Sequence, residues 1–151
     1  MRILIVDDEA GKRRQVQDFI QSEFPNAESW EARSVRSAID LMREQYFDLV
    51  VLDMRLTTYD TSAEEAGGRP RNFGGEELMR KMKRRGLAHP VVVLTQYTLF
   101  GDHGDFCSFN VLRDRLKSGY SNFITMIYFG QSNSQWKSEL RTVLQKICEE
   151  R

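Results

Sequence analysis

The sequence is poor in cysteine and proline, has no excess of charge of either sign and contains no long hydrophobic run. Its two cysteines, Cys107 and Cys148, fit neither zinc-ligand nor Cys-x-x-Cys spacing, so we predict reduced thiols in a cytoplasmic protein. The 22 basic and 22 acidic residues cancel, which argues against nucleic acid or an anionic membrane as a partner. The apolar run 3–6 is too short for a signal peptide or a membrane span.

Strand and helix patterns alternate along the 151 residues, a length that fits one domain. Continuous apolar runs rich in β-branched residues predict buried strands, and apolar residues three or four apart predict amphipathic helices. Strands are expected at 3–6, 27–32, 47–52, 90–94 and 122–128, and helices at 16–24, 35–42, 76–85, 111–117 and 136–147. This alternation predicts an α/β fold, a doubly wound parallel sheet with helices on both faces.

Three of the predicted strands end on polar side chains. Asp7 and Asp8 follow the first strand, Asp53 follows the third, and Thr95 ends the fourth. Because ligands of such sheets bind at the carboxyl ends of the strands, we expect these side chains to share one edge. Clustered carboxylates repel one another, and Mg²⁺ is the cation that such a set favours. With a metal bound, one carboxylate can attack a phosphoryl group while a hydroxyl hydrogen-bonds the phosphoryl oxygens.

Four segments resemble the receiver domain of bacterial two-component response regulators. They are Ile-Leu-Ile-Val-Asp7-Asp8-Glu9, Leu-Val-Val-Leu-Asp53-Met-Arg-Leu, Val-Val-Val-Leu-Thr95, and Leu116-Lys117-Ser118-Gly119 followed by Phe123-Ile124-Thr125. The resemblance spans nearly the whole chain. It implies a flavodoxin-like (βα)5 fold whose five parallel strands have the order 2-1-3-4-5.

The resemblance also implies a role for each site residue. Asp53 would accept the phosphoryl group. Asp8, Asp53 and the backbone carbonyl of Arg55 would bind Mg²⁺ directly, and Asp7 would bind it through water. Thr95 would be the switch hydroxyl and Phe123 the switch aromatic, although a core role for Phe123 is as compatible with the sequence.

The sequence departs from the family's pattern in three places. The family has a lysine at the end of its fifth strand, and an alignment on residues 123–125 places Met126 there instead. The loops 57–73 and 97–110 are both longer than usual. We predict that 57–73 covers the acidic edge or binds a partner, and that Arg69 or Arg71 within it could supply the missing charge.

These features favour a single receiver domain, 1–151, without an output domain. It would take a phosphoryl group from a sensor histidine kinase or phosphotransfer protein and signal through contacts with a further protein or a second copy of itself. It would not be an enzyme beyond handling its own phosphoryl group. The alternative is a pseudo-receiver that mediates protein contacts without phosphorylation. A phosphatase of the haloacid-dehalogenase kind is disfavoured, because Asp53-Met54-Arg55 lacks the second aspartate that such enzymes use as general acid.

Overall fold

The computed structural model describes residues 1–59, 74–102, 105–130 and 134–150. Five parallel strands form the central sheet in the order β2-β1-β3-β4-β7, which is the predicted flavodoxin-like order. Their bounds are β1 Arg2–Val6, β2 Glu28–Ala32, β3 Leu49–Leu52, β4 Val91–Thr95 and β7 Phe123–Tyr128. The sheet is therefore the predicted one, with strand ends shifted by at most two residues.

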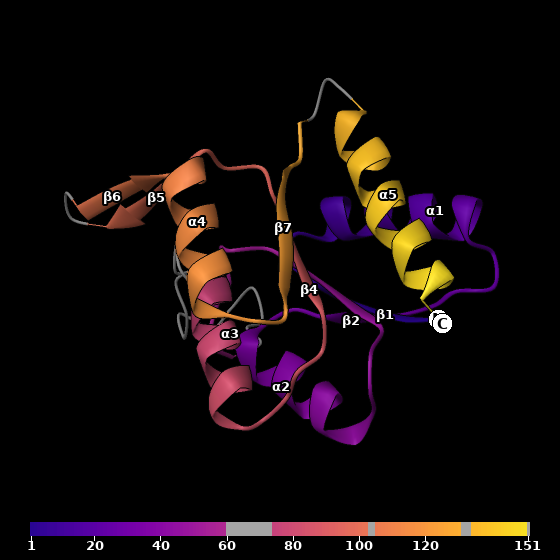
Figure 1. Cartoon of the computed structure of the whole chain (residues 1–151), viewed down its shortest axis with the longest axis horizontal. Coiled ribbons are helices and arrows are strands. Elements are labelled where there is room, and N and C mark those ends of the chain that lie inside the picture. The colour runs from indigo at the N-terminus through magenta and orange to yellow at the C-terminus, as the bar shows by residue number, and fades with distance from the viewer. Residues whose placement is uncertain (60–73, 103–104, 131–133, 151) are drawn as a thin grey trace.

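Five helices cover the two faces of this sheet (Figure 1). Helices α1 (Ala10–Glu23) and α5 (Gln135–Glu149) lie on one face. Helices α2 (Val35–Glu44), α3 (Gly74–Arg84) and α4 (Phe109–Gly119) lie on the other. None of the helices in the described part of the chain is long and apolar enough to cross a membrane.

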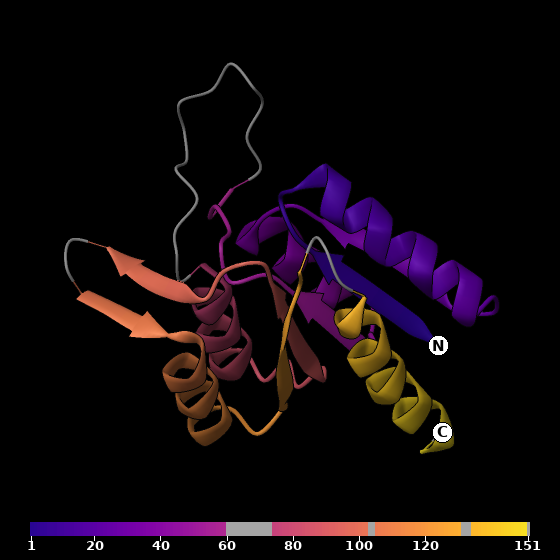
Figure 2. The same cartoon turned by 90° about the horizontal axis from the view of Figure 1, so that it is seen from above.

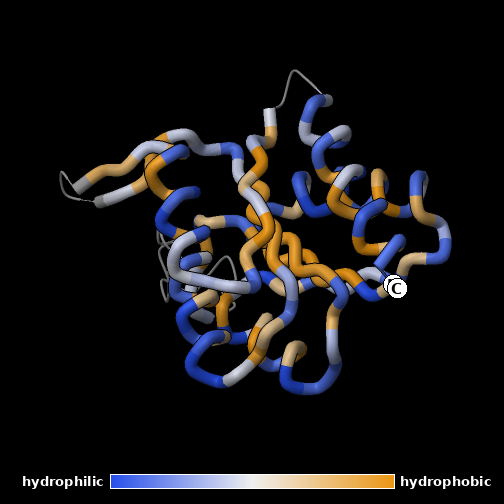
Figure 3. The backbone as a smooth tube through the Cα atoms, viewed as in Figure 1, coloured by the Kyte–Doolittle hydropathy of each residue, from blue (hydrophilic) through white to orange (hydrophobic). Residues whose placement is uncertain are grey.

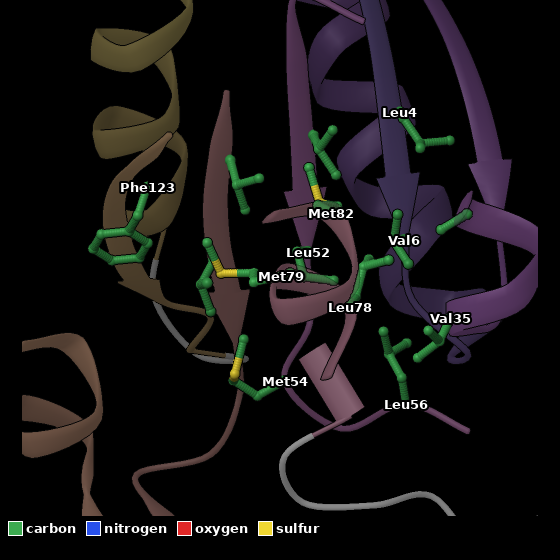
Figure 4. Close-up of a cluster of buried hydrophobic side chains, with 14 of the residues drawn as sticks. Leu4, Val6, Val35, Leu52, Met54, Leu56, Leu78, Met79, Met82 and Phe123 are labelled. Atoms are coloured by element: carbon green, nitrogen blue, oxygen red, sulfur yellow. The ribbon is translucent and has the colours of Figure 1, made fainter. Parts of the chain in front are cut away.

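Alternating side chains of the inner strands β1, β3 and β4 enter two separate cores. Leu4 and Val6 of β1 join the core under α2, α3 and α4, whereas Ile3 and Ile5 join the core under α1 and α5. Figure 4 shows part of the first core, and Figure 3 shows hydrophobic residues concentrated in the strands between the helices. Burial on both faces explains why the strands read as continuous apolar runs.

The stretch between β4 and α4 contains a β-hairpin that the sequence analysis did not predict. Strands β5 (Leu99–Asp102) and β6 (Asp105–Ser108) pair in antiparallel fashion, and the hairpin projects beside α4 (Figure 2). Phe100 is buried in the core, while Leu99 and Phe106 on the hairpin are exposed. The side chain of Phe100 thus anchors the insertion to the domain.

The loop after β3 is described only at its two ends. At its start, the carbonyl of Thr57 accepts a hydrogen bond from the amide of Val35, which joins the loop to the beginning of α2. Residues 60–73 lie outside the described residues, so the predictions for Arg69 and Arg71 stay untested. Where the chain re-enters, Gly75 sits so close to β3 that a Cβ atom would lie 2.6 Å from the carbonyl oxygen of Asp53.

Candidate functional site

The carboxylates of Asp7, Asp8 and Asp53 lie together at the carboxyl edge of the sheet. Parallel pairing of Val6 in β1 with Leu52 in β3 brings the residues that follow the two strands side by side. The amide of Asp53 donates to the carbonyl of Val6. One ligand oxygen from each carboxylate lies within 4.8 Å of the others. The clustering predicted from the strand ends is therefore observed. Asp7 and Asp53 are buried, whereas Asp8 is half-buried.

Thr95 completes the predicted set. It ends β4, is fully buried, and its hydroxyl accepts a hydrogen bond of 3.2 Å from the amide of Tyr97. The same hydroxyl interacts with the Asp53 carboxylate and lowers its pKa. The structure thus places a hydroxyl beside the carboxylate that the sequence analysis proposed as the phosphoacceptor.

The sequence analysis missed Lys12, a buried cation at this site. Lys12 belongs to the first turn of α1 and is 2% exposed. Its Nζ atom lies 2.8 Å from Oδ2 of Asp7 and 3.6 Å from Oδ2 of Asp53, and it donates to the carbonyl of Leu94. The ammonium group also lies over the ring of Phe129, 5.6 Å from its centroid. Two close acceptors, on Leu94 and Asp7, and a second carboxylate at ion-pair distance offset the cost of burying the ammonium.

Burial dominates the electrostatics of the carboxylates. It raises the pKa of Asp53 to about 6, against the lowering effect of Lys12 and with a further raising effect from Asp7. Burial also raises the pKa of Asp8, helped by the negative charge of Asp7. The site therefore holds more negative charge than one lysine offsets, an arrangement that favours a bound cation.

A pocket of about 410 Å³ opens over these groups. Arg55 and Tyr97 line it, with the guanidinium 5.3 Å from the centre of the tyrosine ring and 3.3 Å from the tyrosine hydroxyl. The other lining residues are Asp8, Glu9, Asp53 and Gln96. The acidic site is thus accessible to a small ligand at one side.

The residues present fit Mg²⁺. Oδ1 of Asp53 is buried and has no hydrogen-bond partner among the described residues, so one carboxylate oxygen is available as a ligand. Asp8 offers a second carboxylate beside the pocket. Mg²⁺ binds through one or two carboxylates plus waters, and this donor set meets that requirement.

The end of the last strand corrects one expectation. Met126 pairs with Val93 and packs in the core under α2, α3 and α4, so the prediction that it replaces the family's lysine is wrong. The residues at the strand end are Tyr128, paired with Thr95, and Phe129, whose amide donates to the carbonyl of Thr95. The lysine is still missing there, but aromatic residues take its place.

Phe123 does not reach the site. It is the first residue of β7 and pairs with Val91, at the end of the sheet opposite to Asp53. Figure 4 shows its ring among the core side chains. A register shift between Val91 and Val92 adds a residue to β7, which accounts for one of the two residues that separate Met126 from the strand end at Tyr128.

The loop 97–110 does not add a second acidic site within the described residues. Across all the described residues, the group of potential metal ligands is Asp7, Asp8 and Asp53, and none of these lies in this loop. His103, which the sequence places between two aspartates, lies outside the described residues.

The fold, with acidic side chains at the carboxyl ends of β1 and β3, is that of a response regulator receiver domain. Among solved structures, it is similar to a CheY-like receiver domain protein from Methanospirillum hungatei, with a TM-score of 0.61, 19% identity and coverage of 98% and 94% of the two chains. It is also similar to the response regulator TrrA from Thermotoga maritima, solved with Mg²⁺ and BeF, with a TM-score of 0.62, 20% identity and 97% of each chain covered.

Two curated proteins resemble the chain along nearly all of their length. The Detocs response regulatory protein DtcB of Enterobacter cloacae is 28% identical over 152 residues, which cover 99% of each chain. The uncharacterized protein y4jR of Sinorhizobium fredii is 26% identical over 144 residues, covering 93% of this chain and 95% of its own. No protein-family model matches the sequence.

Proposed function

We propose that this receiver domain accepts a phosphoryl group on Asp53, with Mg²⁺ bound, and signals through protein contacts. The observation that supports this most strongly is the state of Asp53. Its carboxylate is buried beside Asp7, Asp8 and Thr95, and one of its oxygens has no hydrogen-bond partner among the described residues. An oxygen without a partner is free to bind a metal or to attack phosphorus.

The proposed reaction is a transfer between two protein side chains. A carboxylate oxygen of Asp53 forms a bond to phosphorus while the phosphorus–nitrogen bond of a protonated phosphohistidine breaks. The nitrogen keeps the bonding electrons, and neutral imidazole leaves. Negative charge is spread over the three transferred oxygens during this step, so nearby cations and the Thr95 hydroxyl would stabilise it.

Asp8, Asp53 and the carbonyl of Arg55 would hold the metal, with Asp7 bound through water. When bound, Mg²⁺ would neutralise negative charge on the carboxylates and the phosphoryl oxygens. The protein's own contribution is to gather the ligands. The Asp7 carboxylate accepts a hydrogen bond of 2.9 Å from the amide of Glu9, and this bond orders the turn that carries Asp8.

The donor would be a sensor histidine kinase or phosphotransfer protein, and the readout a contact with a further protein or a second copy of the chain. Exposed apolar side chains on the hairpin, α4 and β7 support a protein-binding role; they are Leu99, Phe106, Val111, Ile124 and Tyr128. The match to DtcB, a response regulatory protein, supports a receiver role. The two free cysteines support a cytoplasmic location.

Intact-mass spectrometry after incubation with acetyl phosphate and Mg²⁺ tests this proposal. We expect the wild-type chain to gain the mass of one phosphoryl group, and both Asp53→Asn and Asp8→Asn to lose that gain. Asp18→Asn removes an exposed carboxylate from α1 and serves as the matched control. A wild-type chain that stays unmodified under all conditions, with kinase as well as acetyl phosphate, would favour the pseudo-receiver instead.

A further inference from the structure

The end of β7 brings no positive charge to the site. Tyr128 and Phe129 occupy the strand end beside Thr95, and Phe129 is buried. A phosphoryl group on Asp53 would nevertheless meet two other carboxylates, those of Asp7 and Asp8, whose negative charge opposes it. Some cation from another element must offset that charge if transfer is to be fast.

Lys12 is the cation that the structure offers. Among the described residues, Lys12 is the side chain that forms an ion pair with Asp53, with 3.6 Å between Nζ and Oδ2. This is the longest of its polar contacts, since Asp7 lies at 2.8 Å and the Leu94 carbonyl at 2.5 Å. The ammonium is thus held firmly on two sides and loosely on the side where a phosphoryl oxygen would arrive.

The other nearby cations make no ion pair with the Asp53 carboxylate among the described residues, although the buried Nε of Arg55 has no hydrogen-bond partner there and its charge lowers the pKa of Asp8. Arg13 donates to the backbone carbonyl of Asp7 and pairs with Glu31. Arg55 lies over the ring of Tyr97 and donates to its hydroxyl.

We propose that Lys12, from the first turn of α1, binds the phosphoryl oxygens on Asp53 and thereby replaces a lysine at the end of the last strand. This inference rests on the proposed function. The face of Phe129 fills the space behind the ammonium, 5.6 Å away, and keeps it directed at the carboxylates. Because Lys12 also donates to the carbonyl of Leu94, the residue before Thr95, it links the phosphoryl group to β4.

Four chains test the proposal: wild type, Lys12→Met, Arg14→Met and the double variant Lys12→Met with Phe129→Lys. Methionine keeps an unbranched side chain of similar length without the charge, and Arg14 is an exposed cation on the same helix. The double variant moves the lysine to the strand end, where the family has it. The rate of phosphorylation by acetyl phosphate, with loss of acetate, is measured by intact mass, and Mg²⁺ affinity is measured by calorimetry.

We expect Lys12→Met to slow phosphorylation by at least about tenfold, and up to about a hundredfold as for one lost transition-state contact. The same variant should bind Mg²⁺ several-fold more tightly, because the ammonium no longer competes for the carboxylates. Arg14→Met should match wild type, and the double variant should recover at least part of the rate. A general loss of folding would weaken metal binding as well, so opposite changes in the two measurements exclude it.

Failure of the inference and failure of the proposed function give different results. If wild type is phosphorylated and Lys12→Met reacts at the same rate with unchanged Mg²⁺ affinity, Lys12 has only a structural role and the inference is wrong. A loss of rate that the relocated lysine does not recover, together with weaker Mg²⁺ binding, also overturns it. If wild type itself is never phosphorylated, the proposed function fails and this inference fails with it.

Discussion

The Asp53 side chain is held in an environment that disfavours its ionised form. Burial raises its pKa to about 6, and neither Lys12 nor Thr95 fully offsets that effect. A carboxyl group whose pKa is higher in the folded state than in the unfolded state stabilises the fold only while it is protonated. Above pH 6 the ionised group therefore lowers the free energy of unfolding, which is the energetic cost of a buried, available carboxylate.

Replacing Asp53 with Asn should accordingly stabilise the metal-free protein at pH 8, by about 1–3 kcal/mol. The advantage should shrink as pH falls through 6 towards 4, because wild-type Asp53 then becomes neutral in the folded state as well. Urea unfolding in the presence of a chelator, at several pH values, measures this difference. Asp18→Asn, at an exposed position on α1, should show no such pH dependence. An Asp53→Asn protein less stable than wild type at pH 8 would contradict the argument.

The carboxylates of the site, Asp7, Asp8 and Asp53, could be predicted from the sequence. The cation that pairs with two of them, Lys12, was not predicted. Asp7 and Asp53 follow strands and Thr95 ends one, so topology alone predicts that they meet. Lys12 stands on a helix, where lysine is normally exposed. One signal was available: Lys12 lies four residues before Val16, on the same buried face of α1. A lysine on the apolar stripe of a helix is a candidate for a buried ion pair.

The junction between β3 and α3 depends on the absence of a side chain at Gly75. Its amide donates to the carbonyl of Met54, and a Cβ atom would lie 2.5 Å from the Met54 side chain and 2.6 Å from the Asp53 carbonyl. The backbone oxygen cannot move without displacing Asp53, the proposed phosphoacceptor.

Gly75→Ala should therefore destabilise the protein by about 1–3 kcal/mol and reduce Asp53 phosphorylation. Gly119→Ala is the matched control, since no atom lies within 4 Å of the Cβ position there. That change should be neutral or stabilising by up to about 1 kcal/mol. Thermal or urea unfolding measures both, and equal stability of the two variants would show that the close approach at β3 is unimportant.

Phe100 is the fully buried apolar side chain among the described hairpin residues, and Cys107 packs partly buried against the same core. Phe100 is 2% exposed, whereas its neighbour Leu99 is 60% exposed. We expect Phe100→Ala to cost about 3–5 kcal/mol of unfolding free energy and Leu99→Ala to cost less than about 0.5 kcal/mol. Urea unfolding of the two variants compares adjacent positions of the same strand. Similar small effects at both would mean that the hairpin is a passive insertion.

The strands of the central sheet could be predicted from the pattern of apolar residues. The β5–β6 hairpin and the position of the β7 end could not, because both depend on which strands pair. Strands β1, β3 and β4 are apolar on both faces and could be recognised without a partner. The hairpin strands are only four residues each and include Gly101, Asp102 and Asp105, so their pattern does not predict strands. The end of β7 was misplaced in part because a register shift is invisible in a sequence.

The described part of the molecule places the acidic site at one edge of the sheet and several exposed apolar side chains on the neighbouring hairpin and α4. The strand-end pocket contains Asp8, Asp53 and Arg55, while the exposed Leu99, Phe106 and Val111 lie on the hairpin and α4. Tyr97 and the β4–β5 connection lie between the two regions. This layout suits a domain in which a charge change at the edge alters contacts made by the neighbouring surface.

The central claim is that Asp53, rather than any other side chain, receives the phosphoryl group. Reduction of the phosphorylated protein with borohydride converts an acyl phosphate to the corresponding alcohol, so the modified aspartate becomes homoserine. Peptide mass spectrometry then locates it. We predict homoserine at position 53 in the wild-type protein and at no position in Asp53→Asn or in protein not exposed to the phosphodonor. Homoserine at position 7 or 8, or at none after treatment with kinase or acetyl phosphate, would contradict the assignment.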